Sequence, residues 1–132
     1  MAIQDSEQLR LVATKCVELV AAGSGRQLDW SAESLTILDE VCAELLAEGP
    51  LSEERIDLWF QLVGAYTGEV LIATHGGEWI GHEPPPAAPA VLSLGVTAFP
   101  FAVANRVLSG EPHKSLASFV AALPAVAERS RG

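Results

Sequence analysis

The chain has 132 residues, of which 49% are hydrophobic and 19% charged, and its formal net charge is −9 at pH 7. This length and apolar content are enough for one hydrophobic core, so we expect a single ordered domain over 1–132. The eight Lys and Arg are scattered along the chain. We therefore exclude binding to nucleic acid or anionic lipid, because counterion release needs clustered cations.

The sequence also argues against a membrane protein. A spanning helix needs roughly 18 apolar residues, and the longest apolar run, 62–73, is short and interrupted by Glu69. The first residues lack the basic region of a signal peptide, so we expect a soluble protein of the cytoplasm. In that compartment Cys16 and Cys42, each in the apolar phase of a predicted helix, are expected to be buried free thiols.

Two amphipathic helices are expected in the first third of the chain. Asp5 or Ser6 would cap the first, which runs to about residue 22. The link at 27–30 is either extended or a short strand. Ser31 would cap the second helix, whose charged residues, Asp39 included, mark its solvent side. That helix ends at Gly49-Pro50, because glycine accepts a left-handed conformation and proline cannot continue a helix.

The third predicted helix, capped by Ser52 and running to about Thr74, is the element around which the rest is arranged. Its apolar face is broad, and Gly64 and Gly68 lie together on one flank. Each glycine costs about 1 kcal/mol relative to alanine inside a helix, so the pair needs a reason. Close approach of another backbone is the packing explanation, and room for a ligand is the functional one.

Glu69 is the one charged residue from Gln61 to Thr74, on a helix that we expect to be largely enclosed. A buried carboxylate without a partner is very costly. We expect a cation from another element to pair with it, and Arg106 is the first choice. Tyr66 lies three residues before Glu69, so the two would form either a structural hydrogen bond or an acid–base pair.

Two strands, at about 78–83 and 90–96, are expected to pair as an antiparallel hairpin. Between them, Glu83-Pro-Pro-Pro-Ala-Ala-Pro89 reads as a stiff polyproline-like spacer rather than an SH3 ligand, because no arginine flanks it. A fourth helix, about 100–109, and a fifth that starts at Lys114 or Ser115 and is kinked or ended by Pro124 complete the chain. The predicted fold class is α+β, with about five helices packed on a small antiparallel sheet.

The segment Gly64-Ala-Tyr-Thr-Gly-Glu-Val70, followed by Gly76-Gly-Glu-Trp79, resembles a group of small bacterial proteins with a Gly-x-Tyr-x-Gly-Glu helix and then a Gly-x-Trp strand. Ala98-Phe-Pro-Phe101 is similar to the Phe-Pro step before a later helix of that group. This chain has Thr97-Ala-Phe where others have an Asn-Pro step. The likeness covers roughly residues 28–120. It implies helices against a small sheet, and it implies no activity, because none is established for the group.

Motifs of the common enzyme classes are missing from the sequence. It has no P-loop, no Gly-x-Gly-x-x-Gly, no Gly-x-Ser-x-Gly elbow and no zinc signature. His75 at a helix end is most simply a cation at the negative end of the helix dipole. A shared metal site would need two of His75, His82 and His113 together with Glu69 or Glu78. We expect no metal and no cofactor, and we assign no catalytic residue.

Two functions from different classes remain. In the first, which we favour, the chain is a non-catalytic module that binds a partner protein, or a second copy of itself as a homodimer. Its binding surface would be the apolar residues around Trp79, Ile80 and the proline segment. In the second, the chain is a small-molecule binder or an enzyme, with a pocket around Glu69 between the third helix and the sheet. The candidate ligand-binding residues for that pocket are Tyr66, Glu69, His75, Trp79 and Arg106.

Overall fold

The computed structural model describes residues 6–49, 51–81, 89–112 and 114–131. In chain order, its elements are α1 (Ser6–Ser24), α2 (Ser34–Ala47), α3 (Glu53–His75), β1 (Glu78–Ile80), β2 (Ala90–Ser93), β3 (Val96–Ala98), α4 (Pro100–Leu108) and α5 (Leu116–Arg131). The helices pack with a small three-stranded antiparallel sheet, so the predicted α+β fold class is confirmed. Within these ranges, no helix is both long enough and apolar enough to span a membrane.

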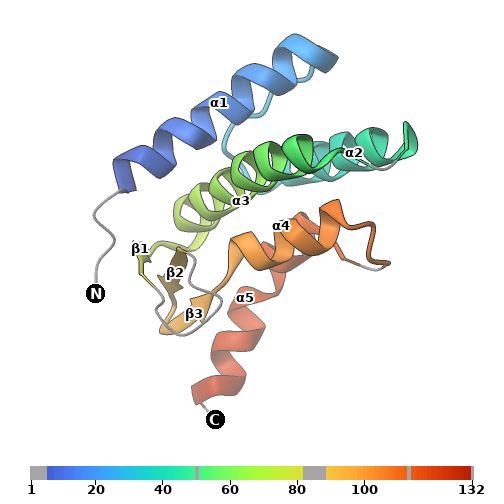
Figure 1. The fold of residues 1–132 in the computed structure, drawn as a ribbon. Helices are drawn as coiled ribbons and strands as arrows, with labels where there is room; N and C mark the ends of the chain where they lie inside the picture. Colours follow the sequence, from blue (N-terminus) through green and yellow to red (C-terminus); the bar gives the residue numbers. More distant parts are fainter. Residues whose placement is uncertain (1–5, 50, 82–88, 113, 132) are drawn as a thin grey trace.

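The central element is α3, with α1 along one side and α4 along the other, and the sheet lies near its C-terminal end (Figure 1). The helix begins where expected, because the Ser52 side chain accepts a hydrogen bond from the backbone N–H of Arg55 at 3.3 Å. From Leu62 to Leu71, every residue except Glu69 is buried. The prediction that the helix is enclosed around Glu69 is therefore confirmed for this stretch, whereas residues 53–61 and the last turn are exposed or half-buried.

Gly64 and Gly68 leave room for aromatic rings. A Cβ added to Gly64 would lie 2.4 Å from Cδ1 of Phe101, and one added to Gly68 would lie 2.1 Å from Cη2 of Trp79. The expectation that another backbone approaches these glycines was therefore wrong. Two rings do so instead, one from α4 and one from β1, with their centroids 6.1 Å apart.

The strand order is β1-β2-β3, and the antiparallel pairing of the two predicted strands is confirmed. The second strand is shorter than expected because Leu94 and Gly95 both have positive φ angles, 54° and 76°. Two such residues make the tight hairpin turn that matches strand twist, and the chain returns as β3, a strand that we did not predict. Residues 27–30 form no strand.

The register of the sheet decides which side chains enter the core. Trp79, Val91 and Ala98 are aligned across the three strands and buried. On the opposite face, Glu78, Leu92 and Thr97 are aligned and exposed. One face of the sheet therefore covers the helices, and the other meets solvent.

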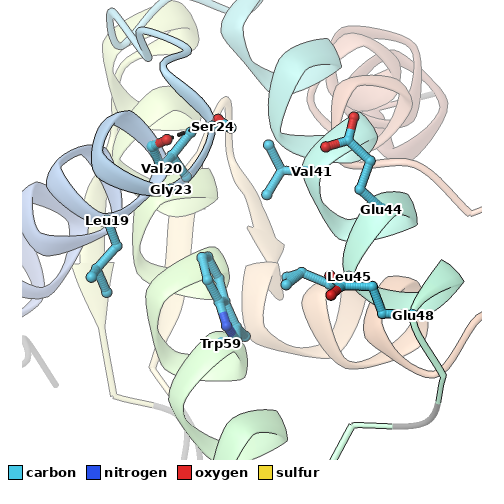
Figure 2. Close-up of a pocket in the computed structure, with 9 residues that line it drawn as sticks. All are labelled: Leu19, Val20, Gly23, Ser24, Val41, Glu44, Leu45, Glu48 and Trp59. Atoms are coloured by element: carbon cyan, nitrogen blue, oxygen red, sulfur yellow. Dashed lines mark hydrogen bonds between the residues drawn. The ribbon is translucent and has the colours of Figure 1, made fainter.

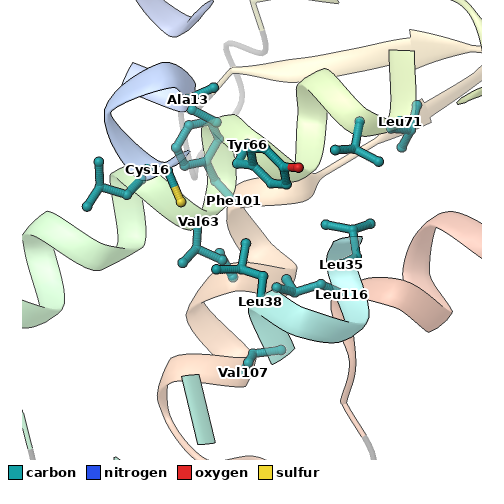
Figure 3. Close-up of a cluster of buried hydrophobic side chains, with 14 of the residues drawn as sticks. Ala13, Cys16, Leu35, Leu38, Val63, Tyr66, Leu71, Phe101, Val107 and Leu116 are labelled. Carbon is teal, nitrogen blue, oxygen red and sulfur yellow. The ribbon is translucent and has the colours of Figure 1, made fainter. Parts of the chain in front are cut away.

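The core lies between α3 and the remaining helices (Figure 3). Cys16 and Cys42 are fully buried in it as free thiols, as predicted. Asp39 is not simply a solvent-facing residue, as we had expected. Its carboxylate accepts hydrogen bonds from the backbone N–H groups of Leu116 (2.8 Å) and Ala117 (3.2 Å), and so it caps α5 from α2.

Replacing Gly68 with Ala is expected to destabilise the fold although alanine favours helix, because the new Cβ meets the buried Trp79 ring. Overpacking of a core costs about 1–3 kcal/mol, and we expect a net loss in that range in urea unfolding followed by tryptophan fluorescence. Gly23→Ala in α1 is the matched control, since its Cβ would meet nothing within 4 Å. It is expected to stabilise by up to about 1 kcal/mol. Equal effects at both positions would refute the ring-contact explanation.

Candidate functional site

Glu69 is paired inside the fold. Its Oε1 accepts a hydrogen bond from Nη1 of Arg10 at 3.0 Å, and its Oε2 accepts one from Nε1 of Trp79 at 2.7 Å. The Glu69 side chain is 12% exposed, whereas that of Arg10 is 54% exposed. The prediction that Arg106 pairs with Glu69 was wrong. The cation comes from α1, which packs along α3, whereas Arg106 lies on the exposed side of α4.

Arg10 also covers the ring of Trp30, with its guanidinium carbon 4.0 Å from the ring centroid. The Trp30 ring in turn packs against that of Tyr66, with the centroids 5.0 Å apart. Trp30 has a φ of 69°, which is strained for a large side chain. The neighbouring contacts hold this residue in that conformation.

The hydroxyl of Tyr66 fixes the link between α1 and α2. It accepts a hydrogen bond from the backbone N–H of Trp30 at 2.8 Å and shares another with Oγ of Ser34 at 2.6 Å. Tyr66 and Glu69 thus have different partners, and the acid–base pair considered from their spacing does not form. We call Arg10, Trp30, Tyr66, Glu69 and Trp79 the Glu69 cluster.

Burial favours the neutral forms of Tyr66 and of the two cysteines. Burial raises the pKa of Tyr66, and hydrogen bonds from Ser34 and the Trp30 backbone oppose this only in part. Burial also raises the pKa of the Cys16 and Cys42 thiols to about 12. A protonated, enclosed thiol is a poor nucleophile. Across the part of the chain that the structure describes, no group of three His, Cys, Asp or Glu residues is arranged to hold a metal ion.

His75 has a structural role that its position in the sequence did not reveal. Its Nε2 lies 2.9 Å from the backbone oxygen of Val120 in α5. In a regular helix that oxygen would accept from the N–H of residue 124, but residue 124 is proline and has none. His75 donates in its place. α5 continues past Pro124 to Arg131, so of the two outcomes that we expected at the proline, a kink or an end, the end is wrong.

Four hollows on the described residues lie away from the Glu69 cluster. One of about 150 Å³ lies between the C-terminal part of α1, α2 and Trp59, with Glu44 and Glu48 beside it (Figure 2). A second of about 500 Å³ and a third of about 330 Å³ flank α4 and share Phe99, Ala102 and Arg106. A fourth, of about 360 Å³, lies near Leu51 and Leu108. Neither Tyr66 nor Glu69 lines any of the four.

The five residues predicted to bind a ligand therefore occupy three places. Tyr66, Glu69 and Trp79 belong to one cluster, while His75 lies against α5 and Arg106 lies between two hollows on α4. Trp79 is only 4% exposed, so it is not part of an apolar surface as we had expected. The proline segment at 83–88 lies outside the described residues. Arg10 and Trp30 were missed, because their contacts depend on helix packing over long sequence separations.

The comparisons with known proteins bear on the fold alone. No protein-family model matches the sequence, and no curated protein matches it. A crystal structure from Bacteroides thetaiotaomicron VPI-5482, determined at 1.50 Å resolution, is similar with a TM-score of 0.67 and 19% sequence identity. The similarity covers 94% of this chain and 45% of that one, so this chain spans less than half the length of the protein it matches.

The two bonds of Glu69 are expected to differ in strength. A hydrogen bond to a charged group contributes about 1.5–3 kcal/mol, whereas an exposed ion pair contributes about 0–1 kcal/mol. Double-mutant cycles by urea unfolding should therefore give a larger coupling for Glu69→Leu with Trp79→Phe than for Glu69→Leu with Arg10→Met. A larger coupling with Arg10 would mean that the ion pair, and not the indole, holds the carboxylate.

His75→Ala is expected to cost about 1–3 kcal/mol, because it leaves the Val120 oxygen without its donor. In a Pro124→Ala background the backbone N–H of residue 124 can donate instead, so the cost should fall below about 1 kcal/mol. Urea unfolding of the four proteins of this cycle measures the difference. An unchanged cost would show that His75 does not replace the missing N–H.

Proposed function

We propose that the chain is a protein-interaction module without catalytic activity, and that it binds its partner through the outer side of α4. We define the α4 surface as Phe99, Ala102, Asn105 and Arg106 with the two hollows beside them. The observation that carries the proposal is this pairing of an exposed helix face with hollows of about 500 and 330 Å³.

The residues of the α4 surface suit contact with another protein. Ala102, Asn105 and Arg106 are exposed, and Phe99 keeps 37% of its surface exposed. The hollows on either side are lined mainly by apolar side chains, including Ile56 and Phe119. Aromatic residues and arginine beside apolar hollows are the residue types that are enriched at protein interfaces.

The alternative, a small molecule bound around Glu69, has less support. Both carboxylate oxygens have donors within the fold, and Tyr66 has two partners of its own. A ligand at this place would have to displace Arg10 or Trp79 and leave their polar groups without partners, which is costly for a buried donor. The Glu69 cluster is therefore assigned to holding α1, α3 and β1 together.

The test compares capture by the purified protein and by variants of the α4 surface. Immobilised wild type, incubated with lysate of the source organism, should retain one protein in stoichiometric amount, identified by mass spectrometry. Ala102→Arg places a long charged side chain on the α4 surface and should abolish retention. Ala43→Arg makes the same change at an exposed position of α2 and should leave retention intact.

Two results would overturn the proposal: equal retention by Ala102→Arg and wild type, or no stoichiometric protein together with a metabolite that raises the melting temperature. If Glu69→Gln then removed that metabolite's effect, the small-molecule function would take its place. Circular dichroism of each variant checks that the fold is unchanged.

A further inference from the structure

We infer that the partner of the α4 surface is a second copy of this chain, related to the first by a two-fold axis. The inference deepens the proposed function and rests on it. Three properties of the surface support a copy of itself over an unrelated partner: its shape, the position of its charges, and their balance.

The shape of the α4 surface is complementary to itself. Phe99, the N-cap of α4, and Ala102 and Arg106 within the helix line both hollows, so these three residues lie between the hollows and form the ridge that separates them. In a two-fold dimer the same patch must fit against itself. A ridge beside a hollow meets this condition, because the rotation places the ridge of each copy over a hollow of the other.

The larger hollow also carries complementary charges. Its lining includes Asp57 from α3 and Arg106 from α4. Both are exposed, and the three ion pairs among the described residues are Arg10–Glu69, Arg26–Glu44 and Lys114–Glu111, so these two residues are not paired with each other. A two-fold axis through this surface would let each Arg106 face Asp57 of the other copy, and the pair would form twice.

The charges of the surface cancel, although the chain carries a net charge of −9. Asp57 and Arg106 are the charged residues among those that line the two hollows. A strongly acidic or strongly basic partner would leave one of them facing a like charge. A second copy of the same surface offers a partner of opposite charge to both Asp57 and Arg106. Repulsion between the remaining charges of the two copies is screened beyond about 8 Å at physiological ionic strength.

Sedimentation equilibrium of the purified chain over a range of concentrations tests the inference by charge reversal. Wild type should dimerise, and Arg106→Asp or Asp57→Arg alone should weaken the dimer at least tenfold, because each places two like-charge contacts in the interface. An equimolar mixture of the two variants should dimerise again. In that mixed dimer the two substituted side chains face each other as an ion pair of reversed polarity, and the second contact keeps its natural Asp57–Arg106 pair.

Glu40→Arg and Arg129→Asp are the matched controls, since they reverse exposed charges outside the α4 surface. They should leave the dimer constant unchanged. A monomeric wild type, a dimer insensitive to both reversals at the α4 surface, or a mixture that stays monomeric would each overturn the inference. If the chain is monomeric but Ala102→Arg still abolishes capture of a different protein, the proposed function stands and the inference alone falls.

Discussion

The structure depends on how closely two aromatic rings approach α3. Phe101 and Trp79 lie where the side chains of residues 64 and 68 would be in any chain without glycine there. These contacts fix the distance of α4 and of the sheet from the central helix. They also place the indole N–H of Trp79 against Glu69, which in turn receives Arg10 from α1. One stretch of α3 thus sets the positions of elements on three sides.

This arrangement explains why the most distinctive residues of the sequence are poor candidates for chemistry. Glu69, Tyr66 and His75 each hold a named group from another part of the chain: Trp79 and Arg10, the 30–34 link, and the backbone of α5. A polar side chain with buried partners stabilises one conformation, and its release for ligand binding would cost those bonds. The surface that we propose for recognition lies instead on α4, where the sequence shows only an ordinary short amphipathic helix.

Much of the fold follows from local patterns. The helices, the Ser52 cap, the enclosure of α3 and the antiparallel pairing of the strands depend on periodicity and on side chains near in sequence. The partner of Glu69 does not, because Arg10 is separated from it by 59 residues and reaches it only through the packing of α1 on α3. The capping of α5 by Asp39 and the direction of Trp79 into the core were hidden for the same reason. The third strand was missed because a leucine at positive φ in the turn is uncommon.

The contact between His75 and the Val120 oxygen joins two positions that are far apart in sequence, one at the end of α3 and one within α5. The need for a donor at 75 exists only because residue 124 is proline. During divergence, a relative that lost the proline would lose the constraint on the histidine, whereas a relative that kept the proline would retain a donor at 75. The two positions should therefore covary among homologous chains, although neither lies on the α4 surface.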